Sequence, residues 1–238
     1  MTTAAIEVED LVFAWPRRPP LLRLKSLRIE SGERVFLMGP SGSGKSTLLG
    51  LIGGVLTPTQ GTIRLIGTDL AELNAGARDV YRGNHVGFIF QQFNLIPYLS
   101  VRSNVLLPFA FSPERRNRIP AGDRDREALR ILSALGIAAP ELLDRQVTEL
   151  SIGQQQRVAA ARALIGRPEI LIADEPTSAL DTDTREEFLR LLLGECNASG
   201  TTLLFVSHDA SLASHFNRVI SMRDFAASPV EPRGEVAA

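Results

Sequence analysis

The chain contains a single cysteine, Cys196, among its 238 residues. One cysteine cannot form a disulfide within the chain, so a fold stapled by disulfides is excluded and a reducing compartment is expected. A zinc site built from several cysteines is excluded for the same reason. We interpret Cys196 as a small packed residue near the end of a helix.

The sequence also lacks an excess of charge and any long apolar run. Lys plus Arg number 26 and Asp plus Glu 27, giving a net charge of −1 and no basic field that would favour nucleic acid. No stretch approaches the roughly 18 apolar residues of a membrane span. The first ten residues, MTTAAIEVED, have no basic region followed by an apolar one, so we expect no signal peptide. Any role at a membrane must come through a partner protein.

What the sequence does have is an alternation of strand and helix patterns. Hydrophobic residues make up 44% of the chain, enough for a sizeable core. Strands are expected at 4–15, twice within 21–39 with a turn at Ser31–Gly32, and at 61–67, 85–91, 169–174, 201–209 and 215–222. Helices are expected at 45–56, 126–137, 150–164 and 184–200. This order predicts an α/β fold with a mainly parallel sheet covered by helices on both faces.

The middle of the chain departs from this alternation. Few strand signals occur between Phe93 and Glu149, which indicates a helical insertion. Within it, residues 112–126 (SPERRNRIPAGDRDR) are charged and rich in turn formers, so we expect a solvated, mobile connection. After Arg223 the sequence has little to bury, and residues 223–238 are expected to form a flexible tail.

The stretch GPSGSGKST, residues 39–47, matches the phosphate-loop pattern G-x-x-x-x-G-K-[ST] between a buried strand and a helix. Glycines let backbone N–H groups approach phosphate oxygens without a Cβ clash. Lys45 supplies positive charge for the β- and γ-phosphates, and the Ser46 hydroxyl is a Mg²⁺ ligand. We therefore predict a site for ATP and Mg²⁺, with nucleotide-binding residues Gly39, Pro40, Ser41, Gly42, Ser43, Gly44, Lys45, Ser46 and Thr47.

Hydrolysis also needs a second metal-holding group and a base. ILIADEP ends an apolar strand with Asp174, a predicted Mg²⁺ ligand, and Glu175, the predicted general base. His208 ends the apolar run LLFVS, where it either contacts the γ-phosphate or is a histidine at the edge of the core. Gln91 follows GFIF and is either a metal-reaching amide or a buried one.

A second anion site is indicated by LSIGQQQRVAAARAL, residues 150–164. Ser151 followed by Gln154 is a capping-box pattern at the start of a helix. A helix N-terminus of this kind binds anions. The residues alone do not explain why one domain would carry two such sites.

Taken in order, GPSGSGKST, Gln91, LSIGQQQRVAAARAL, ILIADEPTSALD and His208 resemble the ATP-binding cassette (ABC) family of ATPases, over about residues 5–222. The resemblance implies a P-loop NTPase domain with an N-terminal antiparallel β subdomain. It implies a RecA-like core at about 5–91 and 157–222 and an inserted helical subdomain at about 92–156. It also makes His208 the expected switch histidine and Gln91 the expected metal- and water-sensing glutamine.

The same resemblance gives the second anion site a role. In this family two chains face each other head to tail, so Ser151, Gly153 and Gln154 would contact the nucleotide of the partner chain. The loop SALD, residues 178–181, resembles the one that couples the two sites. Trp15 matches the aromatic that stacks on adenine, with Phe13 as the competing candidate.

The segment GFIFQQFNLIPYLSVRSNVLLP resembles ATPases paired with lipoprotein-releasing and macrolide-exporter-type permeases. This implies a homodimer, cytoplasmic and peripheral at the inner face of the cell membrane, whose ATP hydrolysis drives a separate integral-membrane permease. The alternative is an ATPase that drives a permease-like partner for signalling or envelope regulation without transport. The resemblance also suggests a docking role for Phe93, Leu95, Ile96, Pro97, Tyr98 and Leu99, whose competing interpretation is the core of the insertion.

The chain departs from the family's usual Leu-Ser-Gly-Gly-Gln signature at one position, where Ile152 replaces the first glycine. Isoleucine would be strained there if the position required a positive φ. We expect ordinary helical dihedrals, because Ser151, Gly153 and Gln154 are retained.

Overall fold

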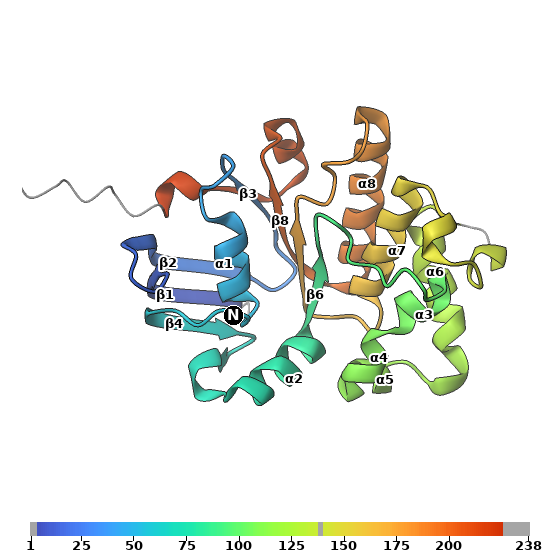
Figure 1. Ribbon diagram of the computed structural model, residues 1–238, viewed down its shortest axis with the longest axis horizontal. Helices are drawn as coiled ribbons and strands as arrows, with labels where there is room; N and C mark the ends of the chain where they lie inside the picture. Colours follow the sequence, from blue (N-terminus) through green and yellow to red (C-terminus); the bar gives the residue numbers. More distant parts are fainter. Residues whose placement is uncertain (1–3, 138–139, 226–238) are drawn as a thin grey trace, which may run out of the picture.

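The computed structural model describes residues 4–137 and 140–225 of the chain. It contains two sheets and a group of helices, arranged side by side (Figure 1). The antiparallel sheet has the order β2-β1-β4-β5, and the second sheet has the order β6-β7-β8-β3-β9 with all neighbours parallel. Figure 1 shows the antiparallel sheet at one end, the parallel sheet in the middle, and helices α3 to α6 at the other end.

The first half of the chain builds the antiparallel sheet and two strands of the parallel one. Its strands are β1 (Ala4–Ala14), β2 (Pro20–Glu30), β3 (Arg34–Met38), β4 (Gln60–Leu65), β5 (Thr68–Asp69) and β6 (Val86–Ile89). Its helices are α1 (Lys45–Ile52) and α2 (Ala75–His85). Helix α1 contacts both β4 and β7 and so joins the two sheets.

The second half supplies the insertion and the remaining strands. The insertion carries α3 (Val101–Leu106), α4 (Pro108–Phe111), α5 (Pro113–Asn117) and α6 (Arg124–Ala134). It is followed by α7 (Ile152–Leu164), β7 (Ile170–Asp174), α8 (Thr182–Ser199), β8 (Thr202–Ser207) and β9 (Arg218–Ser221). The expected strands and helices are confirmed, but helices α2 to α5 and the short strand β5 have no individual counterpart among them.

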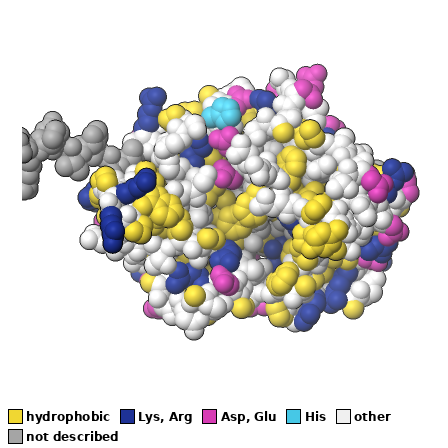
Figure 2. Space-filling model, viewed as in Figure 1, with side chains coloured by type: hydrophobic (Ala, Val, Ile, Leu, Met, Phe, Trp, Pro, Cys, Tyr) yellow, Lys and Arg dark blue, Asp and Glu magenta, His cyan; other side chains and the backbone are white. Residues whose placement is uncertain are grey.

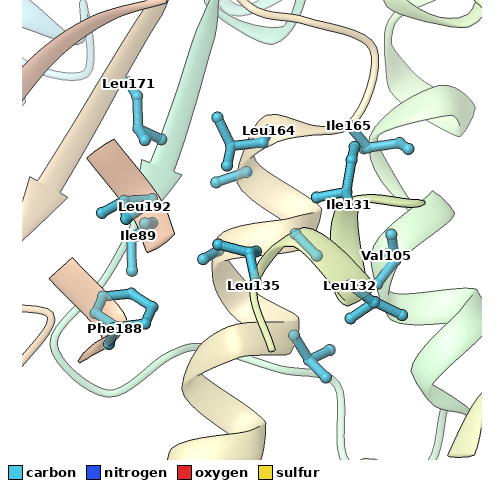
Figure 3. Packing of buried hydrophobic residues seen from close by; sticks show 14 of the residues in the cluster. Ile89, Val105, Ile131, Leu132, Leu135, Leu164, Ile165, Leu171, Phe188 and Leu192 are labelled. Atoms are coloured by element: carbon cyan, nitrogen blue, oxygen red, sulfur yellow. The ribbon is translucent and has the colours of Figure 1, made fainter. Parts of the chain in front are cut away.

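Strands β3, β6, β7 and β8 of the parallel sheet are buried on both faces, which explains their continuous apolar runs. Along β7, Ile170 and Ile172 join the cluster that includes β1, β2 and α1, while Leu171 and Ala173 join the cluster with α7 and α8. Figure 3 shows part of the second cluster, where Leu171 and Ile89 of the sheet face Phe188 and Leu192 of α8 and Leu164 of α7. The carboxyl ends of β3, β7 and β8 therefore meet at one edge of a rigid layer.

The expectation of a solvated connection at 112–126 is correct only in part. Most of its residues are exposed or half-buried, but Ser112, Arg115 and Ile119 are buried. This segment includes α5, and Ser112 and Arg115 are 1% and 3% exposed. Arg115 is buried because its guanidinium donates to the carbonyl oxygens of Ala163 (2.7 Å) and Ile165 (2.9 Å) at the end of α7. The charge pattern indicated a solvated face, since nothing local shows that distant carbonyls accept from this arginine.

Ordered structure continues past residue 223, where the flexible tail is predicted to begin. Residues 223–224 complete a short 3₁₀ helix, Met222–Asp224, and Phe225 is buried. The Phe225 carbonyl accepts a hydrogen bond from the Arg23 backbone N–H at 2.9 Å, which ties this end to β2. The rest of the predicted tail, 226–238, lies outside the described residues. The predicted division at 156/157 falls inside α7, which is continuous, and the subdomain boundaries stay a prediction.

Candidate functional site

The phosphate loop connects β3 to α1, and its shape depends on glycine. Gly44 caps α1 with φ +92, a left-handed conformation that glycine adopts without strain. Gly39 is required for space, because a Cβ there would lie 2.7 Å from Cβ of Met222. The loop therefore turns tightly between β3 and α1, and most of its residues line a pocket at this edge of the sheet.

Lys45 is held at the base of this loop and is only 7% exposed. Its Nζ donates to the carbonyl oxygens of Gly39 (2.9 Å) and Pro40 (3.0 Å) and lies 3.3 Å from Glu175 Oε1. The Glu175 carboxylate neutralises the buried ammonium, and the two carbonyl oxygens orient it. A buried charge is costly without such partners. The side chain is thus fixed between the loop and the predicted base.

A pocket of about 710 Å³ collects the residues predicted from separate motifs. The loop, Gln91, the two acids after β7 and His208 after β8 all line it, although they are far apart in the sequence. Its lining is Leu21, Pro40, Ser41, Gly42, Gly44, Lys45, Ser46, Thr47, Gln91, Asp174, Glu175 and His208. Gly39 and Ser43 belong to the same loop but do not line the pocket. Leu21 is the one lining residue that sequence analysis missed, since it reads as an ordinary strand residue.

Asp174 closes β7 and faces Ser46, whose Oγ donates to Asp174 Oδ2 at 3.0 Å. Burial raises the pKa of the Asp174 carboxyl, and the hydrogen bond from Ser46 and the positive charge of Lys45 oppose that rise. A bound divalent cation would favour the ionised carboxylate further. Hydroxyl, carboxylate and amide oxygens from Ser46, Asp174 and Gln91 form a donor set that suits Mg²⁺, which takes few protein ligands beside water and phosphate.

Glu175 stands between Lys45 and His208. Its Oε2 lies 3.1 Å from Nδ1 of His208, while its Oε1 faces the Lys45 ammonium. The residue has φ +45, unusual for a non-glycine residue, and its backbone N–H donates to the Val206 carbonyl at 2.9 Å. Strained backbone of this kind costs about 1–3 kcal/mol and is typical of functional sites. The arrangement can accept a proton from a water placed at the end of a phosphate chain.

Trp15 does not line the pocket. It lies in the connection between β1 and β2. It is 41% exposed, and its ring meets the Phe13 ring edge-on at 5.1 Å between centroids. Phe13 is 5% exposed and belongs to the hydrophobic core. Of the two aromatic candidates for adenine, Trp15 therefore has the free face, and its role stays a prediction.

The second anion site has the expected local structure. Ser151 Oγ accepts from the Gln154 backbone N–H at 3.3 Å, and Gln154 Oε1 accepts from the Ser151 backbone N–H at 3.0 Å. Among the described residues, those with positive φ do not include Ile152, which is the first residue of α7 and 57% exposed. Isoleucine is therefore accommodated there without backbone strain.

Ser151, Gly153 and Gln154 do not line the pocket that holds the phosphate loop. Their helix N-terminus instead lies against the start of α8: a Cβ built on Gly153 would be 3.8 Å from Thr184 and 3.9 Å from Leu180. The structure thus brings the phosphate loop, Gln91, Asp174, Glu175 and His208 together and leaves the signature residues outside.

Within 4–137 and 140–225, no helix is long and apolar enough to cross a membrane. The same residues contain no group of three or more His, Cys, Asp or Glu side chains placed to hold a metal ion. A metal at this site would therefore depend on hydroxyl, amide, phosphate and water oxygens beside Asp174.

Comparison with known proteins identifies the family of the chain. The sequence model of a family described as ABC transporter matches residues 22–178. A macrolide export ATP-binding/permease protein of Rhodopirellula baltica is 42% identical over 205 residues, which is 86% of this chain and 29% of that protein. The chain thus spans under a third of this relative's length. An uncharacterized ABC transporter ATP-binding protein of Bacillus subtilis is 42% identical over 198 residues, covering 83% of both chains.

Solved structures of ABC proteins share the fold of this chain. The ATP-binding cassette MJ0796, solved as a dimer in a post-hydrolysis state bound to ADP and Pi, has a TM-score of 0.80 and 36% identity. The match covers 91% of this chain and 93% of that one. The cbiO1 protein of Clostridium perfringens, part of an ABC transporter complex, has a TM-score of 0.81 and 26% identity, covering 94% and 85% of the two chains.

Proposed function

The chain belongs to the ABC transporter family and is an ATPase of that family, and we propose that two copies close around ATP to drive a separate membrane permease. Several relatives are macrolide export ATP-binding/permease proteins, which combine ATP-binding and permease parts. We therefore propose a permease of the exporter or lipoprotein-release type. The working location would be the inner face of the cell membrane, with the chain itself in the cytoplasm.

This proposal is supported by the separation of two anion-binding features, the phosphate loop and the N-terminus of α7, within one chain. The pocket holds a phosphate loop and a hydrolytic centre, but the capped N-terminus of α7, also suited to an anion, does not line it. A second copy in head-to-tail apposition would place that N-terminus over the phosphate loop of its partner. ATP would then bind the closed dimer better than the separated chains, and hydrolysis would remove that preference.

The chemistry within one site follows from the contacts. Glu175 would take the proton of the attacking water, while His208, hydrogen-bonded to it, would keep its carboxylate in position. Lys45 would hold the β- and γ-phosphates in place of its present carboxylate contact. Ser46, Asp174 and Gln91 would hold Mg²⁺, which neutralises charge on the phosphates.

A groove beside the insertion supports the permease as a partner. It has a volume of about 300 Å³ and lies between α2 and β6 on one side and α4 on the other. Phe90 and Phe111, which line it, are 40% and 72% exposed. Figure 2 shows hydrophobic side chains gathered over the region of α3 and α4. We propose that a cytoplasmic helix of the permease occupies this groove, because relatives join these two parts in one protein.

The docking residues suggested by the sequence separate into two groups. Phe93 is 9% exposed and Leu95 packs against the core, so these side chains support the insertion from inside. Pro97 is exposed and Tyr98 is 77% exposed, so both remain available to a partner. Ile96 and Leu99 are half-buried and fit either role.

The test uses mixed dimers in the Glu175→Gln background, which should retain bound ATP because hydrolysis is lost. In the split dimer one chain carries Ser151→Ala and the other Lys45→Ala. If the signature acts on the partner's nucleotide, both lesions meet in one site and the other site keeps one ATP. In the matched control one chain carries both lesions and the other neither, so each site is damaged and no ATP is retained. ATP retained per dimer after desalting distinguishes them, and the reversed pattern would contradict the shared site.

A further inference from the structure

Arg185 joins two loops that belong to different halves of the site. It lies in the first turns of α8, and its Nη2 donates to the Leu180 carbonyl at 3.0 Å. Its Nη1 forms an ion pair with Asp209 Oδ2. Leu180 is the third residue of the SALD loop, and Asp209 directly follows His208. One side chain therefore bridges the loop before α8 and the turn after β8.

The Asp209 end of this bridge is firmly anchored. Asp209 Oδ1 accepts from the Ser211 backbone N–H (3.1 Å) and hydroxyl (2.6 Å), and the Asp209 backbone N–H donates to Ser207 Oγ at 3.1 Å. The turn that carries His208 is thus held on both sides. His208 itself is 62% exposed in its side chain and has Glu175 as its one described polar contact.

The Leu180 end lies against the signature helix. Leu180 is 9% exposed and is the nearest side chain to Gly153 after Thr184. Thr184 is itself fixed by Asp181, which accepts from its backbone N–H (3.0 Å) and its hydroxyl (2.9 Å). A displacement of the signature turn would therefore press directly on the first turn of α8.

From these contacts we propose that Arg185 is a positioning residue that couples the chain's two half-sites. Closure of a partner chain against the signature turn moves the SALD loop that contains Leu180, and Arg185 transmits that movement through Asp209 to His208. The inference rests on the proposed shared site. It adds a connection within the chain from the half-site that serves the partner's ATP to the half-site that binds its own.

The guanidinium suits this task because its fork reaches two acceptors in different directions at once. Nη1 and Nη2 serve one loop each, while Nε is buried and has no partner among the described residues. A lysine would carry the same charge but present a single ammonium, which serves as a point charge rather than a rigid fork. Arg185→Lys therefore separates the bridge from the charge.

The experiment measures steady-state ATP hydrolysis by the full chain as a function of ATP concentration. Arg185→Ala and Arg185→Lys should each lower kcat about tenfold while KM changes by less than about twofold, the pattern of a lost transition-state interaction. The Hill coefficient should fall from above 1 towards 1 in both variants. Arg190→Ala is the control, since Arg190 is exposed on the same helix and no ion pair is described for it; it should match the wild type.

If Arg185→Ala does not fold, the thermal midpoint identifies this and Arg185→Lys decides the question. Wild-type kcat and Hill coefficient in a folded Arg185→Lys would overturn the coupling, as would a raised KM at unchanged kcat. A wild-type chain that shows a Hill coefficient of 1 would instead count against the shared site itself. The failure of the proposed function and that of the Arg185 bridge are thereby told apart.

Discussion

At the scale of single residues, the site depends on a carboxylate that is held in place before any ligand arrives. Glu175 has a strained backbone and is fixed between the Lys45 ammonium and the His208 ring. Its position at a strand end places it at the edge of the sheet where the phosphate loop also lies. The contacts of Glu175 with Val206 and His208 would remain when Lys45 turns to the phosphates, so the carboxylate would need little reorganisation at the moment of reaction.

Glu175→Gln should bind ATP and lose most hydrolysis. The amide has nearly the same shape but cannot accept the proton of water, and general bases typically contribute about 10²–10⁴-fold. Phosphate release measures turnover, and size-exclusion chromatography with ATP should show an accumulated dimer. Glu186→Gln, an exposed change on α8, is the matched control. Turnover within about threefold of the wild type would contradict the assignment of the base.

At the scale of elements, the insertion is attached to the sheet layer through the end of α7. Arg115 of α5 donates to two carbonyls there, and neighbouring Arg118 pairs with Glu169 at 2.7 Å just before β7. Positive charge at a helix C-terminus is favourable, and these carbonyls have no partner within the helix. Burial and the nearby Arg118 lower the pKa of Arg115 to about 10, which leaves it protonated at neutral pH.

Arg115→Met should therefore destabilise the chain by about 2–4 kcal/mol, because the aliphatic side chain fills the space but leaves the two carbonyls of α7 unpaired. Urea unfolding followed by circular dichroism measures the change. Arg116→Met at the next position removes a side chain for which no polar contact is described, and it should cost less than about 0.5 kcal/mol. Equal unfolding midpoints for the two variants would contradict the attachment.

At the scale of the whole molecule, two separate surfaces are proposed to bind partners. The signature turn belongs to the proposed contact with a second copy, and the groove lined by Phe90 and Phe111 belongs to the proposed contact with the permease. The groove borders β6, at one edge of the parallel sheet, while β9 forms the opposite edge. A matched surface change on β9 can therefore test whether binding is specific to the groove.

Phe111→Ser should reduce recovery of the permease more than about tenfold when tagged chain is purified from detergent-solubilised membranes, because an exposed aromatic anchor is lost. ATP hydrolysis by the chain alone should be unchanged. Val219→Ser on β9, 47% exposed, should retain the partner. The expected partner is a four-span permease with a large extracytoplasmic domain. Equal recovery with both variants would exclude the groove as the docking site.

The sequence by itself determined the fold class, the elements that flank the phosphate loop and the order of the motifs. These follow from local rules: glycine spacing, apolar runs buried on both faces, and the capping box at Ser151. It also anticipated that Ile152 would take helical dihedrals, which the structure confirms.

Only the tertiary structure decided which distant groups meet. The Lys45–Glu175 pair, the burial of Arg115 in a segment that reads as solvated, and the Arg185 bridge all join residues from different elements. Which of Phe13 and Trp15 keeps an exposed ring likewise depends on which ring the core covers, and the role of Trp15 at adenine stays a prediction. The physical reason is that a spacing rule describes neighbours along one helix or strand. Whether a charge finds an acceptor many residues away depends on how the finished elements pack.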